Sequence, residues 1–333
     1  MKDLLNRLIQ HETIDKDEAK SALLKISSQE VNPLQIASFL TVFMMRKITI
    51  DELEGFKEAL LETCHSIDLS SYDTIDLCGT GGDGKNTFNI STAASFVVAS
   101  LGINVSKHGN YGVSSVSGSS NVLESIGVKF TNDEKLLQRQ MERTGICILH
   151  APLFHPAMKA VASIRKSLAI KTFFNMLGPM VNPSQPKNQL VGVFDLELLR
   201  LYHYLYQKTD KNYCIVNDLN GYDEISLTGK SRLISSSEDM YIRPQDFSVS
   251  QINPQSIYGG KTVEEAAQLF IQVLKGNATD NQINVVSANA AAAIKLKKDI
   301  SYKEAFDLAK NQLKEAKAYQ VLMNLKEETH AYS

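Results

Sequence analysis

The sequence predicts an α/β protein, with a small helical domain and a larger α/β domain built on a mainly parallel central sheet. Residues up to about position 65 carry helix signals only, judged by apolar period and capping residues. From Tyr72 onward, short apolar runs alternate with helical segments. Such alternation is typical of a parallel sheet that helices cover on both faces. The length of 333 residues fits two domains.

The N-terminal domain is predicted from its helix starts. The capping-box pattern, in which two side chains satisfy backbone N–H groups at a helix start, occurs at Asp15–Glu18 and again at Thr49–Glu52. Asn32-Pro33 joins a capping residue to a proline at the first helical position. We expect residues 1–70 to form this helical domain. Helices from about 155–185, a segment that lacks the pattern of a strand unit, are expected to complete it.

The larger domain is expected over residues 71–333. Its end is helical and contains an alanine-rich run from Ala288 to Ala293. The helices expected before that run from near Asn89 to before Gly102, through Leu123 and Ile126 up to Gly127, and over 133–143. The expected strands are residues 74–78, 103–106, 146–150, 189–194, 213–216 and 224–227.

Composition and charge exclude several classes of protein. The net charge of −2 gives no overall basic field for nucleic acid, so an anionic ligand must be bound by a local cluster. The four cysteines form no CxxC pair, and Cys78, Cys147 and Cys214 lie in short apolar runs, as buried thiols of a reducing compartment do. No stretch approaches the ~20 apolar residues of a membrane helix, and the N-terminus lacks the apolar core of a signal peptide. We expect a cytoplasmic protein that binds neither nucleic acid nor a membrane.

A glycine-rich loop follows the first expected strand and precedes a helix. Four glycines lie within Gly79–Gly84, more than a tight turn without a ligand requires. Glycines let backbone N–H groups turn inward, and the helix start adds about half a positive charge, so the loop favours an anion such as phosphate. Asn89, Ser91 and Thr92 open the helix with three hydrogen-bonding side chains, where a cap needs one. This surplus suits a pyrophosphate, and Ser91 offers an oxygen to a metal ion.

Two other phosphate-binding patterns match this loop only in part. The glycines satisfy the dinucleotide pattern, but that pattern also requires an acidic residue about 20 positions later. Neither Asp nor Glu occurs between Gly84 and Glu124. The loop also approaches a P-loop, but Asn86 stands where Ser or Thr would bind magnesium, and Asp83 would repel a triphosphate. Both matches are therefore interpreted as accidental.

A second polar loop, Lys107–Ser120, follows the next expected strand, where ligands of open α/β sheets bind. Its lysine brings a point charge, its serines bring donors, and its glycines allow a close backbone approach. Farther along, Asp223-Glu224 can both reach Mg²⁺, which usually keeps waters and substrate phosphates as other ligands, although such a pair is often only solvated. Arg165 either binds a carboxylate or faces solvent. His108 and His155 are either polar wall residues or core histidines.

Taken together, these stretches resemble the anthranilate phosphoribosyltransferase family, most densely from Asp76 to Leu227. Each motif alone is weak evidence, whereas their order and spacing are specific. The motifs that carry the resemblance are Gly79–Gly84, Asn89–Thr92, Lys107–Asn110, Ser117–Ser119, His155–Lys159, Arg165-Lys166, Asn175–Pro179 with Asn182-Pro183, and Asp223–Gly229.

The resemblance implies an enzyme that transfers the phosphoribosyl group of phosphoribosyl pyrophosphate to the amine of anthranilate, the second step of tryptophan biosynthesis from chorismate. It implies two Mg²⁺ ions per monomer and a homodimer joined through the helical domain. Lys107 would stabilise charge on the leaving pyrophosphate, and no general base is assigned, because the aniline nitrogen is already neutral. Anthranilate would contact Gly79, Asn110 and Arg165; one Mg²⁺ would bind Ser91 and Glu224, and the second would bind Asp223 and Glu224. The residues implied for phosphoribosyl pyrophosphate are Gly79, Gly82, Asp83, Thr87, Asn89, Ile90, Ser91, Thr92, Lys107, His108, Gly109, Asn110, Tyr111, Gly112, Val113, Ser114, Ser115 and Ser119.

The chain departs from the family pattern at Tyr111, Val116, Ser120-Asn121 and Lys230-Ser231. The first two positions usually carry a basic residue, so their replacement predicts weaker pyrophosphate binding. Two alternatives remain: a pyrimidine-nucleoside phosphorylase, which shares the fold but uses inorganic phosphate without magnesium, and a non-catalytic relative that binds nucleic acid. The Asp223-Glu224 pair and the polar helix start favour the transferase over the first. The net charge of −2 and the intact motifs argue against the second.

Overall fold

The computed structural model describes residues 1–112 and 116–331, and the chain divides into two compact units. The helical unit comprises Met1–Ile67 and Ala151–Gln185. The α/β unit comprises Asp68–His150 and Pro186–Ser333. Each unit is therefore built from two separate stretches of the chain. Within the described residues, no helix is both long and apolar enough to cross a membrane.

The helical unit begins with the capped helices that the sequence predicts. Asp15 accepts from the Glu18 N–H at 2.8 Å, Thr49 accepts from the Glu52 N–H at 3.2 Å, and both starts are complete capping boxes. These contacts satisfy N–H groups that a helix start would otherwise leave unpaired. The elements of the unit are α1 (Lys2–Ile9), α2 (Lys16–Ser27), α3 (Pro33–Met45), α4 (Ile50–Glu62), α8 (Ala151–Phe154), α9 (Pro156–Ala160), α10 (Ala162–Leu168), α11 (Phe174–Leu177) and η2 (Gly178–Met180).

A cluster of phenylalanines joins the two stretches of the helical unit. Phe173, from the second stretch, stacks on Phe56 of α4 with ring centroids 4.3 Å apart. Phe39 and Phe43 of α3 meet the same ring edge-on at 6.1 and 5.3 Å. Aromatic pairs of this geometry add to the stabilisation from area burial alone. The segment after α9 thus closes the core of the N-terminal helices.

The α/β unit is organised around one sheet of seven strands with the order β3-β2-β1-β4-β5-β6-β7. The five strands from β3 to β5 are parallel, whereas β6 and β7 add to the edge in antiparallel orientation. This confirms the predicted fold class, with a mainly parallel sheet. The strands are β1 (Ile75–Gly79), β2 (Val105–Gly109), β3 (Ile146–His150), β4 (Asn188–Gly192), β5 (Asn212–Asp218), β6 (Ser231–Ser235) and β7 (Asp239–Ile242).

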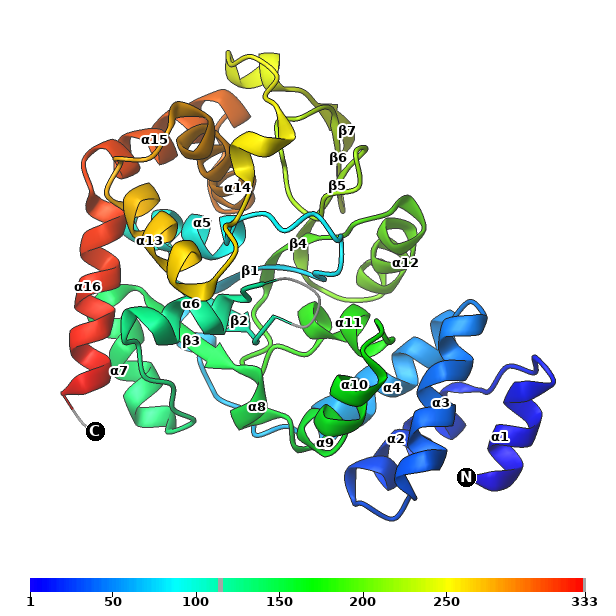
Figure 1. The fold of residues 1–333 in the computed structure, drawn as a ribbon. Helices are drawn as coiled ribbons and strands as arrows, with labels where there is room; N and C mark the ends of the chain where they lie inside the picture. Colours follow the sequence, from blue (N-terminus) through cyan, green and yellow to red (C-terminus); the bar gives the residue numbers. More distant parts are fainter. Residues whose placement is uncertain (113–115, 332–333) are drawn as a thin grey trace. The chain divides into compact units, whose positions relative to one another are not determined.

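Helices cover both faces of this sheet (Figure 1). On one face, Leu77, Leu190 and Val216 of three adjacent strands share a core with α5 and α14. On the other face, Tyr206 of α12 donates to the Gln189 side chain of β4 at 3.0 Å. The remaining elements are η1 (Ser70–Tyr72), α5 (Ile90–Ser100), α6 (Ser119–Ile126), α7 (Glu134–Thr144), α12 (Leu196–Gln207), η3 (Pro244–Phe247), η4 (Pro254–Ile257), α13 (Val263–Leu274), α14 (Asp280–Lys297), α15 (Tyr302–Lys314) and α16 (Lys317–His330).

The expected strand at Glu224–Leu227 was wrong, because these residues form bends and irregular backbone. Ile225 and Leu227 are each 1% exposed, which explains the alternating apolar pattern. Leu227 has a φ of 58°, which is incompatible with an extended strand. The backbone N–H and C=O of Ile225 bind the Asn289 side chain of α14 at 2.9 Å each, in place of a neighbouring strand. The antiparallel edge is instead supplied by β6 and β7.

Candidate active site

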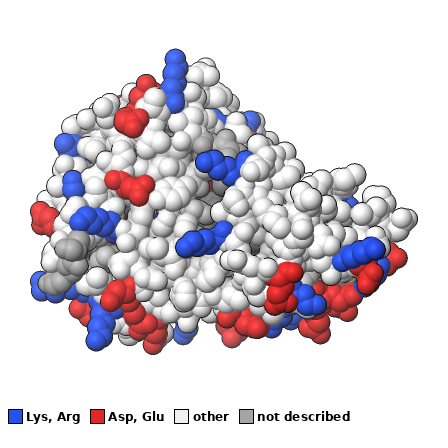
Figure 2. All heavy atoms as spheres, turned by 60° about the horizontal axis from the view of Figure 1, so that its bottom comes forward, with Lys and Arg blue, Asp and Glu red and all other residues white. Residues whose placement is uncertain are grey.

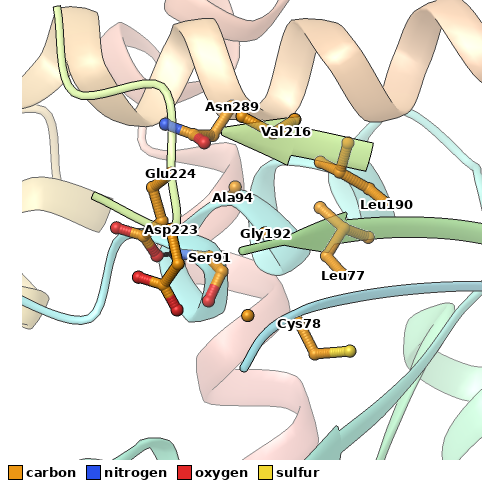
Figure 3. Close-up of a pocket in the computed structure, with 11 residues that line it drawn as sticks. Leu77, Cys78, Ser91, Ala94, Leu190, Gly192, Val216, Asp223, Glu224 and Asn289 are labelled. Atoms are coloured by element: carbon orange, nitrogen blue, oxygen red, sulfur yellow. Dashed lines mark hydrogen bonds between the residues drawn. The ribbon is translucent and has the colours of Figure 1, made fainter. Parts of the chain in front are cut away.

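The predicted phosphate loop and the predicted metal ligands meet at the carboxyl ends of β1, β4 and β5. A pocket there is lined by side chains from these strands, from α5 and α14, and from the Asp223-Glu224 turn (Figure 3). β1 lies between β2 and β4, so the strand order reverses here. Ligands of open α/β sheets bind at such a reversal, because the connections on its two sides leave toward opposite faces.

The glycine-rich loop curls back onto Asp223. Its glycines at 81, 82 and 84 have φ values of 63°, 80° and 74°, a region that other residues rarely adopt. The Gly81 N–H donates to Asp223 Oδ2 at 2.7 Å. A Cβ added at Gly79 would lie 2.3 Å from the same oxygen, so glycine is required there by contact. The loop and the carboxylate therefore hold each other in place.

The start of α5 is held by the second carboxylate. The Ser91 N–H donates to Glu224 Oε1 at 2.9 Å, and Figure 3 shows Ser91 beside both acidic side chains. Asn89, the N-cap residue, makes no side-chain capping bond among the described residues. Its Nδ2 reaches the Ser117 carbonyl at 3.3 Å, while its buried Oδ1 accepts no bond from the described residues. The polar surplus at this helix start is therefore not consumed by capping.

Asp223 and Glu224 bring two negative charges into a largely dry position. Burial raises the pKa of Asp223 to about 7, and the nearby Asp83 carboxylate adds to the rise, while Lys107 opposes it. Burial and the Asp223 charge together raise the pKa of Glu224 well above its ordinary range. Glu224 Oε2 is buried and accepts no hydrogen bond from the described residues. Like charges held this way mark a site that a cation would stabilise.

Lys107, on β2, is a basic residue whose charge acts on Asp223. Its side chain is buried, and its Nζ donates to the His108 carbonyl at 3.3 Å. Strands β1 and β2 pair in register at Ile75 and Val105. Beyond this pair, the Asp76 carboxylate accepts a hydrogen bond from the His108 N–H at 3.2 Å. Asp76 thus replaces backbone hydrogen bonding between the strands where the glycine-rich loop and the loop after β2 leave the sheet. His108 is buried at this point, 5% exposed.

The loop after β2 packs tightly on the start of α6. A Cβ at Gly109 would lie 2.3 Å from Ser119 Oγ, and Ser119 in turn donates to the Asn110 carbonyl at 3.4 Å. Tyr111 places its ring 4.7 Å from that of His150 and donates to Glu124 at 3.2 Å. Val113, Ser114 and Ser115, which were expected to contact phosphoribosyl pyrophosphate, lie outside the described residues.

The two remaining residues singled out in the sequence lie in the helical unit. Arg165 of α10 donates from Nη2 to Asn175 Oδ1 at 3.2 Å, and its Cζ lies 5.3 Å from the ring centre of Phe174. Its Nε is buried and has no partner among the described residues, so the guanidinium keeps donor capacity for a ligand. His155 is fully buried, 3.9 Å from Cys64 Sγ, and is a core histidine.

Sequence reasoning missed three residues that build the site. Asn289 of α14 fixes the Ile225 backbone and with it the acidic turn. Gly192 ends β4 so close to the turn that an added Cβ would lie 1.5 Å from the Asp223 carbonyl oxygen. Asp76 holds the loop after β2. The only local signal was Asn289, a lone amide inside the buried alanine-rich run.

Two family models match the chain. The model described as "Glycosyl transferase family, a/b domain" matches residues 71–319, and "Glycosyl transferase family, helical bundle domain" matches residues 2–64. The anthranilate phosphoribosyltransferase of Flavobacterium psychrophilum is 60% identical over 98% of this chain and 99% of its own length. That of Bacteroides thetaiotaomicron is 49% identical, with 97% of both chains covered.

Solved structures agree with the sequence relatives. The crystal structure of anthranilate phosphoribosyltransferase from Thermus thermophilus has a TM-score of 0.88 at 29% identity, covering 98% of both chains. The enzyme from Saccharomyces cerevisiae, in complex with phosphoribosyl pyrophosphate and Mg, has a TM-score of 0.89 at 25% identity, covering 98% of this chain and 97% of that one. The chain therefore belongs to the glycosyl transferase family that joins a helical bundle to an α/β domain, and within it to the anthranilate phosphoribosyltransferases.

Proposed function

We propose that this chain transfers the phosphoribosyl group from phosphoribosyl pyrophosphate to the amine of anthranilate, giving N-(5-phosphoribosyl)anthranilate and pyrophosphate in tryptophan biosynthesis. The observation that carries the proposal is the Asp223-Glu224 pair. One carboxylate binds the glycine-rich loop and the other binds the start of α5. Hydrogen bonds therefore connect the segments that suit phosphate to the carboxylates that suit a metal ion.

The residues fit magnesium. Both acids have raised pKa values, and Glu224 Oε2 is buried without a hydrogen-bond partner among the described residues, so a cation would relieve an unfavourable charge. In the described part of the chain, no three His, Cys, Asp or Glu side chains are grouped closely enough to hold an ion. The other ligands must then be waters and substrate phosphates, as is usual for Mg²⁺. We assign one ion to Ser91 and Glu224, and a second to Asp223 and Glu224.

Phosphoribosyl pyrophosphate is assigned to the two loops. Asn89, Thr92 and Ser119 offer side-chain hydrogen bonds, and the glycines of the glycine-rich loop and of Lys107–Gly112 allow the backbone to come close to the phosphates. Bound Mg²⁺ would neutralise the pyrophosphate oxygens as the ribose C–O bond breaks. Lys107 adds a fixed positive charge on the same leaving group, and removal of one such preorganised group commonly lowers the rate by about 10²–10³. Gly82, Asp83 and Thr87 complete the assignment.

Anthranilate is assigned to Arg165, Asn110 and Gly79. The unpartnered Arg165 Nε and its terminal nitrogens offer the planar fork that suits a carboxylate. The aniline nitrogen is neutral at pH 7 and attacks ribose C1 without a base, so the chain's contribution is to hold the two substrates in line. Such positioning contributes up to about 7–11 kcal/mol in favourable cases. For this reason no general base is assigned.

A homodimer through the helical unit and a cytoplasmic location complete the proposal. Ile9, Leu34 and Met45 of α1 and α3 are 57%, 78% and 73% exposed, and a second copy packed on the helical unit would cover such apolar side chains. All four cysteines are free thiols and three of them are buried, as expected in a reducing compartment.

The two alternatives have less support. A pyrimidine-nucleoside phosphorylase would not require the acidic pair, and the relatives at 60% identity are anthranilate phosphoribosyltransferases. A relative that binds nucleic acid should present a basic face. On the face shown in Figure 2, basic and acidic side chains are interspersed, and the net charge is −2.

The direct test is a fluorescence assay with anthranilate, phosphoribosyl pyrophosphate and Mg²⁺. The chain contains no tryptophan, so the emission of anthranilate is followed against a low background. We expect a loss of emission that EDTA abolishes and that Glu224→Gln strongly reduces. Folded protein that leaves the emission unchanged would refute the proposal. Uridine or thymidine with inorganic phosphate would then be tested as substrates.

A further inference from the structure

The loop between β2 and α6 closes on itself at one side chain. Asn121, in the first turn of α6, accepts with a single Oδ1 from the Gly112 N–H at 2.9 Å and from the Gly118 N–H at 3.0 Å. These two N–H groups belong to the incoming and outgoing arms of the loop. One carbonyl oxygen thus ties the two arms together.

The arms cross in contact at this point. A Cβ added at Gly118 would lie 2.3 Å from the Gly112 nitrogen and 2.6 Å from the Asn110 carbonyl oxygen, so the crossing tolerates only glycine. The Ser120 N–H donates to the same Asn110 carbonyl at 3.1 Å. The start of α6 therefore holds the incoming arm by backbone as well as by side chain.

A second set of contacts holds the outer side of the same arm. The Tyr111 hydroxyl donates to Glu124, and its ring meets the edge of His150. His150 is fixed in turn, because its Nδ1 lies 2.8 Å from Ser120 Oγ and its ring stacks on that of Phe130 with centroids 4.5 Å apart. Tyr111 stands where the sequence predicted weaker binding from a lost charge. It attaches the loop to α6 through the hydrogen bond to Glu124 and to β3 through the ring contact with His150.

We propose that Asn121 is a positioning residue, which holds Lys107–Gly112 in the shape that binds the pyrophosphate before the substrate arrives. The inference rests on the proposed function. A loop that is already ordered loses less conformational entropy on binding, so the tie should act on affinity for phosphoribosyl pyrophosphate rather than on the chemical step. Asn121 needs only its acceptor oxygen for this, because both hydrogen bonds end on Oδ1.

The test compares Asn121→Leu, which removes the acceptor at similar size, with Asn121→Asp, which keeps it. Asn324→Leu is the matched control, since it removes an amide whose oxygen accepts from Gln320 on α16. We expect the KM for phosphoribosyl pyrophosphate to rise about 5- to 100-fold in Asn121→Leu, the loss of two hydrogen bonds, with kcat within about threefold of the parent. Asn121→Asp should restore the parent KM, and Asn324→Leu should not change it.

Hydrogen–deuterium exchange of the full chain supplies a readout that does not depend on turnover. The peptide containing Gly112 and Gly118 should exchange faster in Asn121→Leu and at the parent rate in Asn121→Asp. If the parent is inactive, the proposed function fails, and binding of magnesium pyrophosphate by the same variants still tests the positioning role. An unchanged KM and unchanged exchange in Asn121→Leu would overturn the inference. So would an Asn121→Asp variant as impaired as Asn121→Leu, because the acceptor would then not be the cause.

Discussion

Replacing Asp223 by asparagine should make the metal-free protein more stable. Burial raises the pKa of this carboxyl from 3.8 to about 7, so the folded protein holds the proton more tightly than the unfolded chain does. Between pH 3.8 and about pH 7, Asp223 is deprotonated in the unfolded chain and still protonated in the folded protein. The free energy of unfolding therefore falls as pH rises through this window and is lowest above pH 7.

The magnitude follows from the size of the shift. One pKa unit corresponds to about 1.4 kcal/mol, so the rise to about 7 costs about 4 kcal/mol at pH 8. At pH 5 most folded molecules still hold the proton on Asp223, so the cost is much smaller. Asparagine keeps an oxygen for the Gly81 N–H and removes the charge. Asp223→Asn should accordingly gain up to about 4 kcal/mol at pH 8 and much less at pH 5, while losing magnesium-dependent activity.

Urea unfolding of the full chain, followed by circular dichroism in EDTA, measures this difference. Asp239→Asn is the control, because its carboxylate is exposed, pairs with Arg232 and has a lowered pKa, so its loss should give no gain. Magnesium with pyrophosphate should stabilise the parent more than the Asp223 variant. A variant that is no more stable than the parent at pH 8, or a gap that is equal at both pH values, would refute the assignment of the shift to buried charge.

Three further substitutions test other parts of the molecule. Arg165→Ala should raise the KM for anthranilate roughly 10- to 150-fold, the loss of a charge-assisted contact, in steady-state kinetics; an unchanged value would remove the carboxylate role. Gly192→Ala would place a Cβ 1.5 Å from the Asp223 carbonyl oxygen, so the magnesium concentration for half-maximal activity should rise at least tenfold, and normal activation would contradict the packing. Glu52→Gln leaves Arg46 buried without its counter-charge and should cost about 3–5 kcal/mol in urea unfolding; a smaller loss would show that water reaches the pair.

The features predicted from the sequence are those that local chemistry determines. The capping boxes at Asp15 and Thr49 and the cap at Asn32 involve side chains within three residues of the backbone groups they satisfy. The left-handed turns of the loop after β1 require glycine whatever surrounds them. The positions of the glycine-rich loop after β1 and of the polar loop after β2 could therefore be predicted. The fold class followed from the alternation of such local signals.

The features that were missed depend on residues far apart in the chain. Asn289 acts on Ile225, 64 positions away, and its amide gives no local pattern beyond its place among alanines. The run from Glu224 to Leu227 was misassigned because apolar residues at alternate positions look the same in a strand and in an irregular segment folded against the core. Only the left-handed φ of Leu227 separates the two, and sequence does not reveal it, since leucine disfavours that conformation.

The contacts of the acidic pair imply that metal binding and loop shape are coupled. Each carboxylate uses one oxygen on backbone N–H groups, Asp223 on the glycine-rich loop and Glu224 on α5, and Glu224 Oε2 is left for a cation. A cation bound by the pair would therefore affect the conformation of both the glycine-rich loop and the start of α5. A phosphate bound there would supply the ligands that the metal ion still lacks. Magnesium and phosphoribosyl pyrophosphate should then strengthen each other's binding by the same factor, as linkage requires. Effects of Asp223→Asn and Glu224→Gln should also be non-additive, because either change breaks the same coupled unit.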